Sequence, residues 1–343
     1  MNKSVVILIL AGVLASSCNT KKKNSGESKA YNTTGTIERI DPALDSIIAP
    51  GAKAEIIADS FDWCEGPLWI ESRHMLLFSD VPKNTIYKWT EENGTGIYLK
   101  PSGYTGFEPS VCKEPGSNGL LFDTSGQLVL CQHGDRRMAR MEAALDQPEA
   151  KFITLADKYE GKRFSSPNDA VFNRLGELFF TDPPYGLHTQ DDTDPKKEIP
   201  FNGVYRLSTE GKVSLVTGSI SRPNGIAFFP GEERLIVASS DPAKPVWWEI
   251  ATGPDDTIYA PKIFYSAEGS DTALKGLPDG LKIDKNGIVF ATGPGGIWIF
   301  NKEAKLLGKI RLDNAASNCA LSADQKTLYI TNDMYVLRVK MRD

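Results

Sequence analysis

Six segments of the chain open with a side chain that ends in an oxygen donor, and this repetition is the strongest chemical signal in the sequence. The six opening residues are Glu65, Asn118, Asn168, Asn224, Asp279 and Asn318. Hard divalent cations take six to eight oxygen ligands, and Ca²⁺ tolerates the irregular geometry that separate segments supply, whereas Mg²⁺ demands a near-ideal octahedron. None of the six is His or Cys, which argues against zinc. If the fold brings them together, they predict a calcium site, with other divalent cations as alternatives.

The same residues have a plainer interpretation as turn formers, because Asn-Gly and Asp-Gly pairs commonly precede strands. Taken singly, each opening is explained in that way. The interpretation suits Glu65 less well because glutamate is not a turn former, and it suits Asn168 less well because Asp follows it instead of Gly. The set as a whole therefore favours ligands over turns.

Each opening begins a repeated unit of strand-length apolar runs that are separated by Gly, Asn and Asp turns. The openings recur about every 40 to 56 residues. A second run, rich in β-branched or aromatic residues, follows each opening, at 75–80, 127–132, 177–182, 235–241, 288–293 and 327–333. A third run follows at 84–89, 136–141, 203–208, 246–250, 296–300 and 335–340.

Six units of short antiparallel strands predict an all-β fold, a six-bladed β-propeller, which protects its sheet edges by radial repetition. The apolar segment 54–60 precedes the first unit, and we expect it to supply the outer strand of the last blade and close the ring. The first strand of each blade lines the central channel of a propeller. The six openings are therefore expected to converge near the axis.

The N-terminus carries an export signal. Lys3, an apolar run over 5–14 and small residues precede Cys18, and the run is too short for a permanent membrane helix. Residues 1–17 are predicted to be a lipoprotein signal peptide with Cys18 as the acylated residue, 18–51 a flexible tether and 52–343 the propeller. We expect an exported lipoprotein on the periplasm-facing membrane or cell envelope, attached to the membrane only through its lipid.

The net charge and the cysteine spacing limit the classes of binding partner and metal site that the chain can have. The net charge is -5 with both signs interspersed, so no nucleic-acid footprint is visible, and a monomer that binds a small molecule is expected. Cys64, Cys112, Cys131 and Cys319 fit no zinc spacing. They are interpreted as buried small apolar residues, with a Cys64–Cys319 bridge as an alternative because both flank openings in adjacent blades.

Several motifs in order resemble those of the senescence marker protein, gluconolactonase and luciferin-regenerating enzyme family, whose members are six-bladed calcium propellers. The motifs are EGPLW, SPNDAVF, FFTDPPYGL, RPNGIAF and LPDGLKID, and QHGDRR further resembles the bacterial gluconolactonase branch. The resemblance implies that Glu65, Asn168, Asn224 and Asp279 ligate one catalytic Ca²⁺, with Asn168 also assigned to the substrate. Ser166 stands where the animal members have Arg, so their substrate contacts do not transfer.

The expected reaction is the opening of a sugar lactone by metal-activated water, with Asp279 as the catalytic base. Asn118, His133 and Tyr185 are the further candidates for substrate binding, although His133 has a structural alternative and Tyr185 lies in a rigid Pro-Pro-Tyr-Gly loop. The polar insertion 188–198 is either a lid or a solvated loop. Another esterase or phosphotriesterase on the same site, and a non-catalytic sugar-binding propeller, are the alternative functions.

Overall fold

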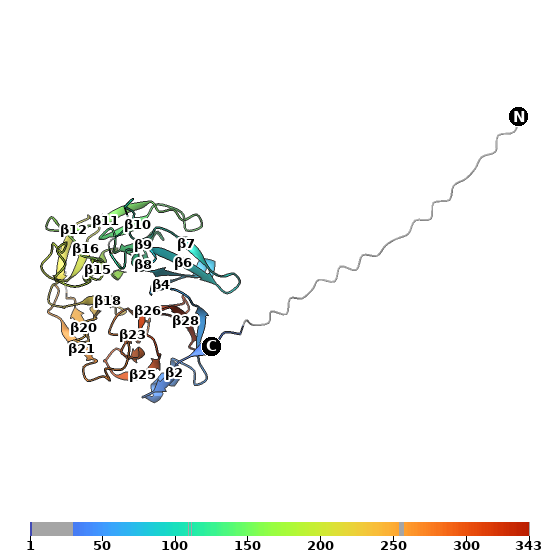
Figure 1. Ribbon diagram of the computed structural model, residues 1–343. Helices are drawn as coiled ribbons and strands as arrows, with labels where there is room; N and C mark the ends of the chain where they lie inside the picture. Colours follow the sequence, from blue (N-terminus) through green and yellow to red (C-terminus); the bar gives the residue numbers. More distant parts are fainter. Residues whose placement is uncertain (2–29, 109, 111, 254–256, 343) are drawn as a thin grey trace. The chain divides into compact units, whose positions relative to one another are not determined.

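The computed structural model describes residues 1, 30–108, 110, 112–253 and 257–342. The propeller unit begins at Tyr31, and its described residues form six antiparallel blades around one axis, together with a separate two-stranded hairpin (Figure 1). The predicted all-β, six-bladed β-propeller is confirmed. Among the described residues, no helix is long and apolar enough to cross a membrane. The predicted signal peptide and Cys18 lie outside the described residues.

Each blade is a meander whose first strand lies nearest the axis. Blade 1 is made of β4 (Cys64–Ile70), β5 (Met75–Asp80), β6 (Thr85–Thr90) and β7 (Gly94–Leu99). Blade 2 is made of β8 (Ser117–Phe122), β9 (Leu128–Gln132), β10 (Arg137–Met141) and β11 (Phe152–Ala156). Blade 3 is made of β14 (Ala170–Phe172), β15 (Leu178–Asp182), β16 (Gly203–Leu207) and β17 (Val213–Thr217).

The second half of the ring repeats this plan. Blade 4 is made of β18 (Pro223–Phe228), β19 (Arg234–Ser239), β20 (Val246–Ala251) and β21 (Lys262–Ser266). Blade 5 contains β22 (Leu281–Ile283), β23 (Val289–Gly293), β24 (Gly296–Phe300) and β25 (Leu306–Arg311). Blade 6 contains β26 (Ala316–Leu321), β27 (Thr327–Asn332) and β28 (Tyr335–Lys340). The short hairpin β12 (Lys158–Tyr159) and β13 (Lys162–Arg163), and the 3₁₀ turn η2 (Glu71–Arg73), connect strands.

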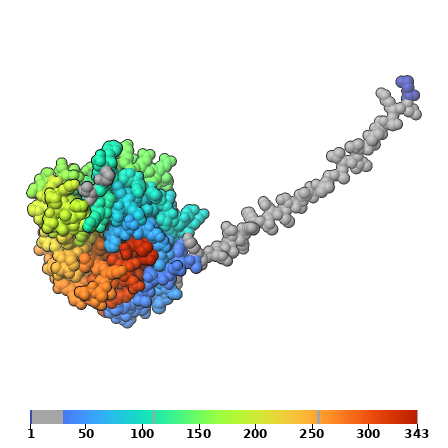
Figure 2. All heavy atoms as spheres, in the orientation of Figure 1, coloured from blue at the N-terminus to red at the C-terminus, as the bar shows by residue number. Residues whose placement is uncertain are grey.

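The N-terminal part of the propeller closes the ring. β3 (Ala54–Ala58) pairs antiparallel with β28 and becomes the fourth strand of blade 6, which confirms the predicted role of segment 54–60. Figure 2 shows C-terminal residues, in red, beside N-terminal residues, in blue, on one face of the propeller. The first and last parts of the propeller chain are thus joined in one sheet.

The predicted tether extends too far into the chain. β1 (Thr33–Thr34) pairs with β3, β2 (Thr36–Arg39) pairs with β25, and η1 (Pro42–Ser46) follows. Leu44 and Ile48 are fully buried against blades 5 and 6. A few buried apolar residues in a polar stretch give no periodic signal, so the sequence alone predicts a flexible tether over the whole of 18–51.

The middle strands are buried on both faces because neighbouring blades cover them, and their sequences are accordingly continuous apolar runs. All six residues of β5 are buried. Between blades 4 and 5, Trp247 packs against Trp298 and Phe300, each with ring centroids 5.4 Å apart. This dry packing holds the inner strands, and hence the axial side chains, in fixed positions.

Candidate active site at the axial cavity

Five of the six opening residues line one cavity of about 470 Å³ at the axis: Glu65, Asn118, Asn168, Asn224 and Asp279. Three of them lie in the inner strands β4, β8 and β18, and Asn168 and Asp279 come two residues before β14 and β22. The predicted convergence therefore holds for these five. The volume is within the ~300–1,000 Å³ typical of ligand pockets.

Glycine after the opening residue allows the inner strands to approach closely. A Cβ on Gly66 would lie 2.1 Å from the carbonyl oxygen of Asn118, and one on Gly225 would lie 2.2 Å from that of Asp279. No side chain fits at these distances, so the Gly in these motifs serves strand packing at the axis and not merely a turn. The close approach is what crowds five oxygen-bearing side chains into one cavity.

The cavity wall carries buried oxygens that have no hydrogen-bond partner among the described residues. They are Oδ1 of Asn118, Asn168, Asn224 and Asp279. The amide of Asn224 is fixed because its Nδ2 donates to Ser240 Oγ at 2.9 Å, and that hydroxyl in turn donates to the Pro278 carbonyl at 2.7 Å. Buried polar atoms are ordinarily satisfied, so four orphaned oxygens in one wall indicate a missing partner of positive charge.

The two carboxylates of this wall point to the same conclusion. Burial raises the pKa of Glu65 to about 8, although the Gly66 N–H that it accepts opposes this. Burial, followed by repulsion from Glu65 and Asp169, raises the pKa of Asp279 well above its ordinary range. A bound cation would reverse both effects by favouring the ionised forms.

The donor set fits calcium. Among the described residues no three His, Cys, Asp or Glu side chains gather around one point, so the two carboxylates need the amide oxygens to complete a ligand set. All donors in the wall are oxygens, which suits Ca²⁺ and not zinc. Glu65, Asn168, Asn224 and Asp279 are the residues that would hold the ion, and Asn118 supplies a fifth oxygen in the same wall.

Asn318, the sixth opening residue, also reaches the axis, where its side chain contacts Asp169 and Glu65, but it does not line this cavity. Its Oδ1 accepts the Cys319 N–H at 2.8 Å, and its Nδ2 donates to Asp169 Oδ2 at 3.4 Å. Lys282 lies nearby, with Nζ 3.9 Å from the same Asp169 oxygen. The amide oxygen of Asn318 is thus committed to the protein.

Two of the family motifs are tied together by a buried carboxylate. Asp182 accepts the N–H groups of Ser165 and Ser166, at 2.9 and 2.6 Å. Ser166 Oγ donates to the Pro183 carbonyl and accepts the Gly186 N–H. Ser166 therefore holds the loop of Tyr185 against the loop of Asn168, which is a structural role.

Tyr185 and His133 occupy different positions relative to the cavity. Tyr185 lines it, and its hydroxyl donates to the Ser240 carbonyl at 3.4 Å. His133 is fully buried, does not line the cavity, and places Nδ1 3.8 Å from Glu114 Oε2. Burial lowers the pKa of His133 to about 3, so the ring is neutral. Its predicted contact with substrate stays a prediction.

Glu114 and Gln190 are two of the lining residues that were not predicted from the sequence. Glu114 belongs to the connection between β7 and β8, and Gln190 belongs to the polar insertion 188–198. Gln190 Nε2 donates to Glu114 Oε1 at 2.9 Å. The insertion therefore contributes Gln190 to the cavity wall, while most of its other residues are exposed or partly exposed.

The four cysteines in the described part of the chain are present as free thiols. Cys64, Cys131 and Cys319 are buried and Cys112 is partly exposed. Cys319 Sγ donates to the Phe290 carbonyl at 3.4 Å. The structure thus supports the interpretation as buried small residues for three of the four, and the alternative Cys64–Cys319 bridge is not formed.

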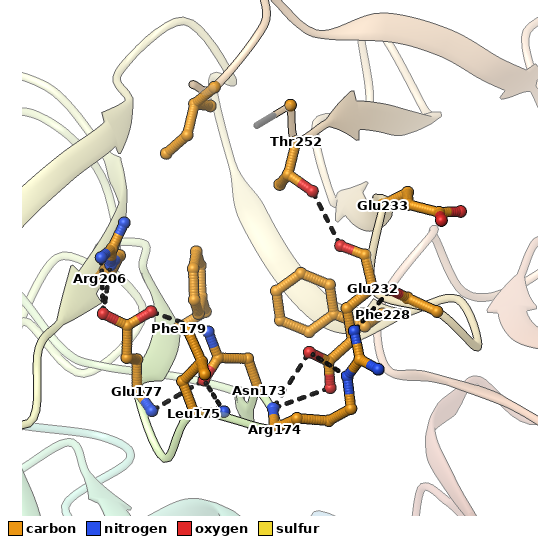
Figure 3. Close-up of a pocket in the computed structure, with 13 residues that line it drawn as sticks. Asn173, Arg174, Leu175, Glu177, Phe179, Arg206, Phe228, Glu232, Glu233 and Thr252 are labelled. Carbon is orange, nitrogen blue, oxygen red and sulfur yellow. Dashed lines mark hydrogen bonds and ion pairs between the residues drawn. The ribbon is translucent and has the colours of Figure 1, made fainter. Parts of the chain in front are cut away.

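A second cavity, of about 650 Å³, lies between blades 3 and 4 (Figure 3). Four of its five charged side chains are paired: Arg206 Nη2 lies 2.6 Å from Glu177 Oε1, and Arg174 Nε lies 3.1 Å from Glu232 Oε2. The axial cavity, in contrast, presents oxygens without partners. We therefore assign the candidate active site to the axial cavity.

Comparison with known proteins shows which family the chain resembles. Residues 63–333 match the family described as SMP-30/Gluconolactonase/LRE-like region. A gluconolactonase from Zymomonas mobilis is 36% identical over 345 residues, which cover 99% of this chain and 96% of that protein. A diisopropyl-fluorophosphatase from Loligo vulgaris is 26% identical over 256 residues, covering 70% of this chain and 79% of that protein. The structure of a gluconolactonase from Xanthomonas campestris has a TM-score of 0.78 at 27% identity and covers 92% of this chain and 98% of that chain.

Proposed function

The chain belongs to the SMP-30/gluconolactonase/LRE-like family, and on this premise we propose that it is a calcium-dependent hydrolase that opens sugar lactones. The gluconolactonases from Zymomonas mobilis and Xanthomonas campestris support a lactone-hydrolysing enzyme. The observation that carries the calcium dependence is the group of four buried, unpartnered oxygens beside the buried carboxylate of Glu65.

Glu65, Asn168, Asn224 and Asp279 would hold the ion. When bound, Ca²⁺ supplies a Lewis acid that polarises a carbonyl and lowers the pKa of a nearby water. Asn118 and Tyr185 line the same cavity, and we assign them to the bound lactone: the amide to a ring substituent and the aromatic face to the sugar ring. Asn168 also faces this space, so we assign it to both ion and substrate.

Asp279 is our candidate for the general base. It is partly exposed whereas Glu65 is buried, and its Oδ1 has no partner among the described residues. In the proposed step the water oxygen bonds to the carbonyl carbon while Asp279 takes the water proton. The ring C–O bond then breaks, and Asp279 returns the proton to the departing ring oxygen, which gives the open hydroxy acid.

A second reaction on the same site is the hydrolysis of a phosphotriester or a related ester. The similarity to the diisopropyl-fluorophosphatase favours keeping it as an alternative, since the fold and an ion site alone do not fix the reaction. The two functions are separated by relative kcat/KM on glucono-1,5-lactone and on diisopropyl fluorophosphate.

We also propose export and anchoring through a lipid on Cys18, on the strength of the sequence pattern that precedes this residue. Metabolic labelling with palmitate tests it, since Cys18→Ser should lose both the label and the membrane fraction. Labelling that persists in this variant would contradict the anchor.

The main experiment measures proton release from glucono-1,5-lactone with Ca²⁺, after chelation, and after Ca²⁺ is restored. We expect turnover to require the ion. We expect Asp279→Asn to abolish turnover while the fold is retained. Asp284→Asn is the matched control, because Asp284 is a buried carboxylate that follows β22 and accepts N–H groups of its own turn, at Asn286 and Ile288. If the ion-loaded wild type hydrolyses the lactone no faster than the uncatalysed background rate, the lactonase proposal is refuted.

A further inference from the structure

Beyond the ion-binding wall, the axial cavity has a second polar wall that is built from two loops. Glu114 approaches from the connection between blades 1 and 2, and Gln190 approaches from the insertion in blade 3. Their side chains meet through the hydrogen bond from Gln190 Nε2 to Glu114 Oε1. None of the inner strands contributes this pair.

The insertion that carries Gln190 is held in place by the protein. Asp194 accepts the N–H groups of Thr189 and Lys196, at 2.9 and 2.8 Å. Arg222 Nη1 donates to the Gln190 carbonyl at 3.3 Å, and Gln190 Nε2 also lies 3.2 Å from the Tyr185 carbonyl. The side chain of Gln190 therefore faces the cavity in a preformed arrangement, which keeps the entropic cost of binding low.

Glu114 retains unused hydrogen-bonding capacity toward the cavity. Only 22% of its side chain is exposed, and Oε2 lies 3.8 Å from His133 Nδ1, beyond hydrogen-bond distance. Burial raises the pKa of Glu114 to about 7, so its ionised form prevails above that pH. In this form the carboxylate accepts hydrogen bonds from substrate hydroxyl groups, and such bonds to a charged acceptor are stronger than neutral ones. A site built to bind hydroxyls in this way discriminates strongly against analogues that lack them.

We propose that Glu114 and Gln190 form the specificity wall of the site, where they bind ring hydroxyls and select polyhydroxylated lactones over unsubstituted ones. This inference rests on the proposed function for the identity of the reacting ring, but the roles are separate. The ion-binding wall acts on the carbonyl group that every lactone has, whereas Glu114 and Gln190 contact groups that only a sugar lactone has.

The test compares kcat/KM for glucono-1,5-lactone with kcat/KM for δ-valerolactone, which has the same ring without hydroxyls. For Glu114→Gln we expect the first to fall about tenfold to a hundredfold, from the loss of hydrogen bonds to a charged group, and the second to change less than about threefold. Gln190→Ala should show the same asymmetry. Glu268→Gln, which removes an exposed carboxylate, should change neither value, and Ca²⁺ affinity should be the same in all four proteins.

Equal losses on both lactones, or no loss on either, would overturn the specificity wall while leaving the lactonase proposal intact. If the wild type opens neither lactone, the proposed function fails. The specificity wall can then still be tested by measuring the binding of a sugar lactam. Calorimetry with the hydrolytically stable D-glucono-1,5-lactam should then show binding to the wild type that Glu114→Gln weakens at least tenfold. Equal binding, or no binding to the wild type, would overturn the inference.

Discussion

Without its ion, the protein should lose stability as the pH rises, and Glu65→Gln should remove a defined part of that loss. Burial raises the pKa of Glu65 from an ordinary value of 4.5 to about 8. An acid whose pKa is raised by folding binds more protons in the folded state, so stability falls between the unfolded and the folded pKa. Between pH 4.5 and pH 7 this group ionises in the unfolded chain while the folded protein keeps it protonated. At 1.36 kcal/mol for each pKa unit, this difference lowers the free energy of unfolding by about 3 kcal/mol.

The assay is urea unfolding in chelator at pH 4.5, 5.5 and 7, with the free energy of unfolding compared between Glu65→Gln and the wild type. Other titrating groups are common to both proteins, so the difference between them isolates Glu65. Relief of the repulsion on Asp279 adds to the difference in the same direction. Glu268→Gln controls for the removal of one negative charge from the chain.

Added Ca²⁺ should narrow the difference in stability between the two proteins at pH 7. At a calcium concentration 100 times its Kd, the wild type gains about 2.7 kcal/mol, and the variant, which lacks one ligand, gains less. A difference in chelator that does not change with pH would refute the desolvation of Glu65. An equal gain from Ca²⁺ in both proteins would refute its role as a ligand.

Three further predictions concern the scaffold. Leu44→Ala, which empties a fully buried position in the N-terminal arm, should lower the free energy of urea unfolding by about 2–5 kcal/mol and leave kcat/KM unchanged; an unchanged stability would contradict the arm's packing. Arg338→Met should lower the free energy of unfolding by about 1–2 kcal/mol in the same assay. The substitution removes the ion-pair partner of Glu55 and Glu91 at the ring closure, but both carboxylates stay partly hydrated. Among the four propeller cysteines, a thiol reagent should modify Cys112 first and the other three only on unfolding, and fewer than four thiols by mass spectrometry after denaturation would reveal a bridge.

The fold was predictable because each blade of a propeller repeats the same pattern of strands in the sequence. Every blade needs an inner strand that begins at the axis and a middle strand that is buried on both faces. The runs that start at Met75, Gln127 and Glu177 all became middle strands, β5, β9 and β15. The N-terminal arm was missed because it is used once, so its anchors at Leu44 and Ile48 form no pattern.

The oxygen cluster was predictable to the extent that position in the repeat determines direction. Glu65, Asn118 and Asn224 lie in inner strands, where the blade geometry points their side chains at the cavity. Asn318 occupies the same place in the repeat, but its amide bonds to the backbone of Cys319 and to Asp169. That choice depends on Asp169, which directly precedes β14 of blade 3 on the opposite side of the ring, and no local pattern reports such a contact.

Glu114 and Gln190 show why the specificity of such a site is harder to predict than its chemistry. An ion at the axis needs ligands there, and only the inner strands and the residues just before them reach the axis, so the repeat reveals these ligands. Substrate hydroxyls lie further from the axis, where loops of different length reach over the cavity and follow no repeat. The pair comes from positions 76 residues apart and meets only because Arg222 and Asp194 fix the insertion. Members of one fold can therefore keep the same ion site while differing in the ring substituents that they accept, and a change of substrate should require loop residues to change before any ligand does.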